Sequence, residues 1–391
     1  MSIKLKAPLT IIGSGIAGYT VAREFRNLDK ETPLRIITAD EGVFYSKPLI
    51  SNALSQQKAA SALAMLAATK LAEQIHAQIH TFSTVNAIDT QQQTVSTQAG
   101  ERWEYSQLVL ACGAQPIRLP LAGNAAAQIL SVNNLDDYAK LFAALENKQK
   151  VIVLGAGLIG CEFANDLAKA GFKVDVVALS ATPLDLLLPP ALGTVVQSAL
   201  ETLGINWFLN TAASAVNFQG AGYEVCLENG QSLYADVVLS AVGIKPVTHL
   251  ASAAGINVRR GIVVDAYLQT NVPQVYAVGD CAEVAGHLLQ YITPIMRGAR
   301  ALAKTLAGTA TAVSYPAMPI VVKTPNCPLV LVLPPVNVKG DWEIAYQQGT
   351  DVKALYYDKQ GKVQGFILMG HQIPEKTALL KQIPPLLELP V

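Results

Sequence analysis

Residues 9–18 read LTIIGSGIAG, a short apolar run followed at once by three glycines in the spacing GxGxxG. The apolar run predicts a strand buried on both faces, and the residues after it predict a helix over 16–25. The first glycine allows a tight turn, the second lets backbone N–H groups approach a diphosphate, and the third lets helix and strand pack closely. The start of a helix adds unpaired donors and the positive end of its dipole. The stretch predicts a dinucleotide-binding turn, with contacts from Gly13, Ser14, Gly15, Ile16, Ala17 and Gly18.

The same pattern returns 142 residues later as VIVLGAGLIG over residues 151–160, where a helix is predicted over 158–167. A single GxGxxG is a weak signal, because a glycine-rich turn is often only a turn. Two copies in the same strand, turn and helix context favour two dinucleotide sites. The second copy predicts contacts from Gly155, Gly157, Leu158, Ile159 and Gly160.

The two copies differ in the feature that selects a nucleotide. After the first, the predicted strand over 34–38 leads to Asp40, 22 residues beyond Gly18 and well placed to accept hydrogen bonds from a ribose diol. After the second, the strand over 174–178 leads to Leu179 and Ser180, with neither an acid nor an arginine. The sequence therefore favours NAD over NADP only by default.

Other short runs support the same organisation. Residues 108–113 and 237–243 each read as a buried strand that ends in a small residue and a glycine, where chain crosses between domains near a cofactor. This pattern adds Ala111, Gly113 and Gly243 to the predicted site. Residues 270–280, TNVPQVYAVGD, bring Gly279 and Asp280 to the end of a strand, where the carboxylate can accept from sugar hydroxyls. An ordinary turn is the alternative interpretation of that last pair.

The chain changes character near residue 315. Predicted strands follow over 320–323, 329–333, 343–347, 353–357 and 363–369, with one helix over 375–382. Strands in sequence followed by a helix indicate a small α+β domain. The fold class predicted for the whole chain is α/β, with two Rossmann-like domains and this C-terminal addition.

Composition excludes several other classes of protein. The 391 residues are 51% hydrophobic and 15% charged, with 29 basic and 29 acidic side chains, so no global field attracts nucleic acid or an anionic membrane. No apolar run approaches the roughly 20 residues of a membrane span, and residues 9–12 run directly into Gly13 without a signal-peptide pattern, so a cytoplasmic protein is expected. No two of the five cysteines lie within 45 positions of each other, which predicts reduced thiols and no metal site.

Taken together, these motifs resemble the two-dinucleotide-binding-domain flavoprotein reductases over essentially the whole chain. The resemblance implies FAD on the first glycine turn, with further contacts from Val85 and Ile292 and with Asp280 on the ribityl chain, and NADH on the inserted second turn. It implies an FAD domain over 1–114 and 249–313, an NAD domain over 115–248 and a C-terminal domain over 314–391. Residues 44–49 (FYSKPL), 160–166 (GCEFAND) and 321–328 (VVKTPNCP) are similar to the branch that passes electrons to rubredoxin in bacterial alkane hydroxylation.

Departures from the wider family narrow the chemistry. Disulfide reductases carry cysteines after the second strand, but residues 44–52 contain none, which excludes thiol chemistry there. Ferredoxin reductases resemble this run but have arginine where Lys47 stands and lysine where Asn52 stands. Glu162, which the resemblance places beside the flavin edge, lacks that ammonium partner, and Lys47 or Lys323 is expected to replace it. These three residues are the predicted catalytic set.

Two further predictions concern the reduced flavin and its acceptor. Thr293 and Pro294 predict a helix start, with Thr293 as N-cap, Pro294 at the first helical position and the run 295–306 behind it. The dipole of this helix could stabilise anionic reduced flavin. The alternative is a helix that only packs the domain. Because the resemblance implies an acidic rubredoxin as partner, a basic docking patch is expected among Lys47, Arg297, Arg300, Lys323 and Lys339.

Rival functions stay open on the sequence. A ferredoxin reductase or an NADH oxidase would use the same fold. A protein that binds flavin and senses NADH without catalytic turnover is an alternative from a different functional class. The missing cysteine pair removes the need for a shared active site, so a monomer is mildly preferred.

Overall fold

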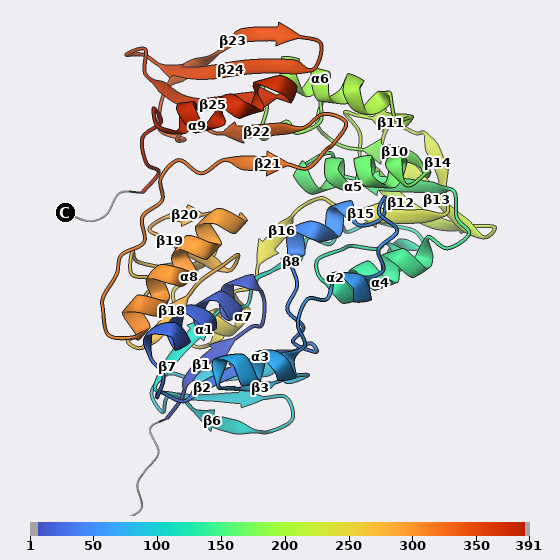
Figure 1. The fold of residues 1–391 in the computed structure, drawn as a ribbon. Coiled ribbons are helices and arrows are strands. Elements are labelled where there is room, and N and C mark those ends of the chain that lie inside the picture. Colours follow the sequence, from blue (N-terminus) through green and yellow to red (C-terminus); the bar gives the residue numbers. More distant parts are fainter. Residues whose placement is uncertain (1–6, 388–391) are drawn as a thin grey trace, which may run out of the picture.

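The computed structural model describes residues 7–387. Its first sheet has five parallel strands in the order β18-β7-β1-β2-β3. These strands are β1 (Leu9–Ile12), β2 (Leu34–Ile37), β3 (Ala77–His80), β7 (Gln107–Leu110) and β18 (Val275–Ala277). The helices of this part are α1 (Ile16–Leu28), α3 (Ala68–Ile75), α7 (His249–Ala253) and α8 (Ile292–Leu306). Strand β18 comes from far along the chain, so the first nucleotide-binding part is closed only after the second has been inserted (Figure 1).

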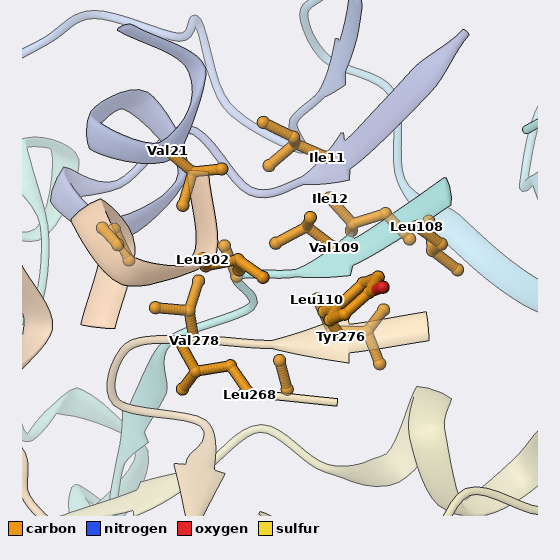
Figure 2. Close-up of a cluster of buried hydrophobic side chains, with 14 of the residues drawn as sticks. Ile11, Ile12, Val21, Leu108, Val109, Leu110, Leu268, Tyr276, Val278 and Leu302 are labelled. Atoms are coloured by element: carbon orange, nitrogen blue, oxygen red, sulfur yellow. The ribbon is translucent and has the colours of Figure 1, made fainter. Parts of the chain in front are cut away.

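The core of the first part explains why its strands are apolar throughout. Side chains of β1 and β7 meet those of α1 and α8, as Ile11, Val109, Val21 and Leu302 show in Figure 2. All four are essentially inaccessible to solvent. A parallel sheet covered on both faces requires such continuous apolar strands.

The second sheet repeats this plan with four parallel strands in the order β11-β10-β9-β15. Its strands are β9 (Lys150–Leu154), β10 (Lys173–Val177), β11 (Ile205–Phe208) and β15 (Val237–Ser240). Its helices are α4 (Leu135–Ala144), α5 (Leu158–Lys169) and α6 (Pro190–Glu201). Each of the two parallel sheets also leads into a three-stranded antiparallel sheet after its third strand. These are β4 (Val85–Asp89) with β5 (Thr94–Thr97) and β6 (Arg102–Glu104), and β12 (Ala213–Gln219) with β13 (Gly222–Leu227) and β14 (Ser232–Ala235).

The chain crosses between the two parts through a pair of short antiparallel strands, β8 (Ala114–Pro116) and β16 (Ile244–Pro246). Smaller elements complete these parts. They are η1 (Lys47–Asn52), α2 (Ala60–Leu63), η2 (Ala126–Gln128), β17 (Ile262–Val264), β19 (Ala282–Val284) and β20 (His287–Leu288).

The C-terminal part is one antiparallel sheet in the order β21-β22-β25-β24-β23. Its elements are β21 (Ile320–Val322), β22 (Leu329–Val332), β23 (Gly340–Gln348), β24 (Asp351–Asp358), β25 (Val363–Met369), η3 (Gly370–Glu375) and α9 (Lys376–Leu380). One face of the sheet, including Val322 and Leu331, shares a core with the second nucleotide-binding part. The other face, including Val330 and Phe366, packs against Leu379 of α9.

The predicted fold class is confirmed. The helix expected over 375–382 is shorter in the structure, where α9 directly follows η3, which contains Pro374, and ends four residues before Pro384. Within residues 7–387 no helix has the length and apolar character that crossing a bilayer requires. The domain limits near 114, 248 and 313 stay a prediction.

Candidate active site

The first glycine turn requires glycine at two of its positions for steric reasons. Gly13 has a φ of +113°, and a Cβ there would lie 2.2 Å from the carbonyl oxygen of Ala111. A Cβ on Gly18 would lie 2.0 Å from the carbonyl oxygen of Gly13. Gly15 is different, because no atom of the described residues comes within 4 Å of the place its Cβ would take. The turn is therefore tightly packed on one side and open beside Gly15.

The residues at this opening fit a dinucleotide diphosphate. Helix α1 begins at Ile16 directly after Gly15, and its start has no side-chain cap and no acidic residue in the first turn. Its first N–H groups are thus available to an anion, in the field of the helix dipole. Free donors next to open space are what a diphosphate needs, so the predicted flavin dinucleotide fits here.

Asp40 lies beside this turn and is held by three donors. The hydroxyl of Thr38 donates to Asp40 Oδ1 at 2.7 Å, the backbone N–H of Gly42 at 2.9 Å and the hydroxyl of Ser14 at 3.1 Å. Among residues 7–387, Oδ2 accepts no hydrogen bond, which leaves it for a ribose hydroxyl. Val85 opens β4 just after a loop whose Phe82 donates its N–H to the carbonyl of Asp40 at 2.9 Å.

The second glycine turn has the same construction. Gly155 has a φ of +107° and would place a Cβ 2.7 Å from the carbonyl oxygen of Ala241, while Gly160 would place one 2.0 Å from the carbonyl oxygen of Gly155. No described atom lies within 4 Å of a Cβ on Gly157, and α5 begins after it with no side-chain cap. Leu158 is half-buried, whereas Ile159 is 45% exposed at the start of the helix. This turn also fits a diphosphate.

The two strands expected to end near the cofactors are followed by the predicted glycines. Gly113 (φ +69°) follows β7 and leads into β8, and Gly243 (φ +111°) follows β15 and leads into β16. Both glycines thus lie where the chain leaves the carboxyl end of a parallel sheet and crosses between the two parts. Ala111 borders the first turn through its carbonyl oxygen. The five cysteines are free, and Cys161, Cys281 and Cys327 are buried.

Glu162 is completely buried and is the centre of a hydrogen-bonded cluster. Its Oε1 accepts the backbone N–H of Lys323 at 2.8 Å, and its Oε2 accepts the Lys323 ammonium at 2.8 Å and the Ser51 hydroxyl at 2.5 Å. The ammonium also donates to the carbonyl of Pro48 at 2.6 Å. A buried carboxylate needs such compensation. Of the two lysines that the sequence proposed as its partner, the structure pairs Glu162 with Lys323.

The members of this cluster come from three parts of the chain. Ser51 belongs to η1, Glu162 lies on α5 directly after the second glycine turn, and Lys323 follows β21 of the C-terminal sheet. The two nucleotide-binding parts and the C-terminal part therefore meet at one ion pair.

Two more residues of α5 strengthen this junction, and the sequence analysis did not find them. Asp166 accepts the N–H of Leu54 at 2.8 Å and also bonds the hydroxyl of Ser55, while Asn165 Oδ1 accepts the N–H of Asn326 at 3.3 Å. Burial raises the pKa of Asp166, against the opposing effect of its hydrogen bonds. With Glu162 these residues have the spacing i, i+3, i+4 of one helix face, which is the signal that could have revealed them.

Lys47 takes part in a different contact. Its ammonium donates to Asn133 Oδ1 at 2.8 Å and lies 4.0 Å from Asp280 Oδ2. Asn133 in turn donates through Nδ2 to the carbonyl of Ala114 in β8, at 2.9 Å. Burial lowers the pKa of Lys47 and raises that of Asp280, and each partner's charge opposes the other's shift.

Gly279 places this contact next to the first turn. Its φ is +89°, and a Cβ there would lie 2.8 Å from the Cβ of Ala17 in α1. The Gly279 and Asp280 pair is therefore packed against the helix of the first glycine turn, where an ordinary surface turn would not lie.

The predicted start of α8 is wrong by two residues. The helix is Ile292–Leu306 with Tyr291 at the N-cap, so Thr293 is already helical and makes no capping bond. Pro294 is tolerated at the third helical position because N–H groups of the first turn have no partner within the helix. Ile292 and Thr293 are exposed at this helix start.

The five cations proposed for docking do not share one environment. Lys323 is paired with Glu162, Lys47 lies near Asp280, and Arg300 pairs with Glu24 at 3.2 Å. Arg297 on α8 and Lys339, next to the edge strand β23, are exposed. These two are the members best placed to meet an approaching acidic surface, although they lie on different parts of the fold.

Two parallel sheets, each with a glycine turn that fits a diphosphate, define a protein that binds two dinucleotides. The family model for pyridine nucleotide-disulphide oxidoreductases matches residues 7–305, and that for the rubredoxin binding C-terminal domain matches residues 312–383. The chain belongs to the pyridine nucleotide-disulphide oxidoreductase family, as the sequence predicted. Membership implies a flavin and a pyridine nucleotide.

Similar proteins include two curated relatives of nearly equal length. A rubredoxin-NAD(+) reductase of Alcanivorax borkumensis is 44% identical and covers 96% of this chain and 98% of its own. One from Acinetobacter baylyi is 45% identical, covering 97% and 98%. The structure of a putidaredoxin reductase in covalent complex with putidaredoxin matches with a TM-score of 0.87 at 23% identity, over 97% of this chain and 94% of that one, which supports the fold.

Proposed function

We propose that this protein is a reductase in which a bound FAD accepts hydride from NADH and passes the electrons one at a time to rubredoxin. The observation that carries the proposal is the Ser51, Glu162 and Lys323 cluster, in which both nucleotide-binding parts and the C-terminal part meet. A hydride transfer between two cofactors requires them to be brought together at such a junction. The names of the two curated relatives support NADH as donor and rubredoxin as acceptor.

The bound flavin supplies the redox chemistry, since it accepts two electrons together and releases them one at a time. The chain would hold the FAD diphosphate at the start of α1, one ribose at Asp40, and the sugar chain at Asp280. Lys47, fixed by Asn133, would keep a positive charge beside Asp280. The start of α8, with Ile292 and Thr293, would direct its dipole at negative charge on the reduced ring.

Glu162 and Lys323 are proposed to position the nicotinamide end of NADH. Glu162 lies on the helix whose start would bind the NADH diphosphate, and Lys323 fixes its side chain from the C-terminal part. Their charges cancel within the pair, so the junction presents no net charge to the hydride path. This is a role in orientation, and the proton and electron chemistry remains with the cofactors.

An anaerobic titration tests the proposal directly. The purified protein should be yellow, release FAD on denaturation as identified by chromatography, lose its flavin absorbance on addition of NADH, and recover it on addition of oxidised rubredoxin. A colourless protein, or a flavin that NADH leaves oxidised, would contradict the proposal. A reduced flavin that ferredoxin or oxygen reoxidises faster than rubredoxin would instead favour one of the rival reductases.

The docking of an acidic carrier has its own test. Turnover with rubredoxin should slow as salt concentration rises, while NADH reduction of a small neutral dye changes little. Equal salt responses would remove the electrostatic argument for Arg297 and Lys339. The part in alkane hydroxylation and the cytoplasmic location stay predictions.

A further inference from the structure

Residues 45–65 belong to the first nucleotide-binding part by their place in the sequence, yet their apolar side chains are buried in the second part. Phe44 and Leu66 pair at the base of this segment, where Phe44 donates its N–H to the carbonyl of Leu66 at 2.8 Å. Beyond this base the segment crosses to the second part, so that α2 lies beside α4 (Figure 1). Its side chains in the core of the second part are those of Ile50, Ala53, Leu54 and Leu63. We call residues 45–65 the clasp.

Hydrogen bonds from the second part fix the backbone of the clasp just after η1. Asp166 Oδ2 accepts the N–H of Leu54 at 2.8 Å, and its Oδ1 accepts the N–H of Ser55 at 3.2 Å together with the hydroxyl of the same serine. Among residues 7–387 neither N–H donates to a backbone carbonyl. Successive N–H groups that point at one anion form a concave site, which the carboxylate fills here. Tyr138 on α4 adds a second anchor, because its hydroxyl donates to the carbonyl of Lys58 at 2.7 Å.

Asp166 depends on the clasp for the compensation of its own charge. Its side chain is 1% exposed, and within the described range 7–387 it forms no salt bridge. A buried carboxylate without a paired cation is stabilised by hydrogen bonds from N–H and hydroxyl groups. The bonds that order the clasp are thus the bonds that compensate the carboxylate.

The beginning of the clasp meets the site proposed for the flavin. Lys47 begins η1 and its ammonium lies 4.0 Å from Asp280, while the hydroxyl of Ser51 donates to Glu162 at 2.5 Å. A 3₁₀ helix rises about 2 Å per residue, so η1 spans about 8 Å between positions 47 and 51. In the proposed function the flavin ring reacts between the sugar chain at Asp280 and the nicotinamide at Glu162, so it would lie beside η1.

We propose that Asp166 is a positioning residue for bound FAD, because it holds the clasp so that η1 and Lys47 lie against the flavin. The proposal deepens the function proposed above and rests on it. Asp166 is too deeply buried to touch the cofactor itself, and it acts through the backbone of Leu54 and Ser55. The second nucleotide-binding part thus shapes the site of the cofactor that the first part binds.

The test variant is Asp166→Asn, in which an amide nitrogen replaces one acceptor oxygen and one donor of the clasp loses its partner. In the holoprotein, the amides of residues 53–57 should exchange hydrogen at least about tenfold faster, as measured by mass spectrometry. FAD release after dilution, followed by flavin fluorescence, should also accelerate about tenfold. The midpoint potential of the flavin should become more negative, because a less ordered Lys47 stabilises the anionic reduced ring less. Ser55→Ala removes only the hydroxyl donor and should shift all three readouts in the same direction by a smaller amount.

Asp175→Asn is the matched control. Asp175 is also 1% exposed in the second part, where it pairs with Lys150 at 2.8 Å. Its neighbours on both sides in β10 face the core that the clasp shares, so Asp175 points to the opposite face of the sheet. Asp175→Asn should lower the melting temperature but leave FAD release, the midpoint potential and exchange in residues 53–57 unchanged.

The outcomes separate this proposal from the function on which it depends. If residues 53–57 exchange faster in Asp166→Asn but FAD release and the midpoint potential match the wild type, Asp166 supports only the fold and the inference is overturned. It is also overturned if exchange and FAD release both stay within twofold of the wild type, or if Asp175→Asn accelerates FAD release as far as Asp166→Asn does. If all three readouts change as expected but NADH leaves the flavin oxidised, Asp166 positions FAD as inferred and the proposed reductase function fails.

Discussion

Removal of the Lys323 ammonium should weaken the junction of the three parts of the chain. In Lys323→Met, Glu162 keeps the backbone N–H of residue 323 and the Ser51 hydroxyl but loses the one cation with which it pairs among residues 7–387. Removing one partner of a buried ion pair lowers the free energy of unfolding by about 3–5 kcal/mol, because the other charge is left buried without compensation. The Lys323 side chain is 31% exposed while that of Glu162 is inaccessible, so we expect the lower end, about 3 kcal/mol.

Removal of both charges should cost less than removal of one. In Glu162→Gln with Lys323→Met, no charge is left buried, and the double variant should lose about 1 kcal/mol, the size of an ordinary net hydrogen bond. Glu162→Gln alone should be intermediate, since water reaches the partly exposed ammonium. The double-variant cycle should therefore show a coupling of about 3–5 kcal/mol.

Urea denaturation of the holoproteins measures these differences. Tryptophan fluorescence follows Trp207 in the second sheet and Trp342 in the C-terminal sheet, and flavin fluorescence follows cofactor release. A free energy is derived only where the two probes coincide. If Lys323→Met and the double variant both stay within about 0.5 kcal/mol of the wild type, the size of an ordinary surface substitution, the pair does not hold the parts together and the reasoning is refuted.

Three further predictions address the first site and the stability of its part. Gly15→Ala should fold normally but bind FAD at least about tenfold more weakly in a fluorescence titration, because its methyl group fills the opening beside the turn. Gly18→Ala should instead give insoluble protein, since its Cβ would lie 2.0 Å from a carbonyl oxygen. Equal FAD binding by Gly15→Ala and wild type would disprove the proposed position of the diphosphate. Asn133→Leu should remove the hydrogen-bond acceptor of the Lys47 ammonium and weaken FAD retention several-fold in dialysis. Asn133→Ser should restore part of this retention. Identical retention in both variants would argue against a role of the Lys47–Asn133 hydrogen bond in holding FAD. Burial raises the pKa of Asp29, but three hydrogen bonds from the following loop outweigh burial and lower the pKa. The stabilisation that Asp29 provides is therefore present above its unfolded pKa of about 3.9 and is lost as pH falls through the folded value. Asp29→Asn should thus be less stable than wild type at pH 7, with the difference vanishing in acid denaturation, and a constant difference down to pH 2 would count against this reasoning.

The sequence by itself determined the two nucleotide-binding turns. Their glycines are required by contacts within a few residues or with the neighbouring strand, as for Gly18 against Gly13 and Gly160 against Gly155. Such short-range geometry is written in the spacing of the motif, and continuous apolar strands reveal a parallel sheet in the same local way. The family followed from these signals, because they occur twice in one chain.

Only the tertiary structure decided how the side chains between the parts are paired. Glu162 and Lys323 are 161 positions apart, and Lys47 and Asn133 are 86 apart, so no local pattern specifies which lysine reaches which acceptor. The start of α8 was likewise misplaced, by two residues, because Thr293 and Pro294 are also tolerated at the second and third helical positions, where they lie in the structure. These contacts depend on how whole sheets pack against one another, and that packing sums many weak apolar contacts that no short stretch of sequence contains.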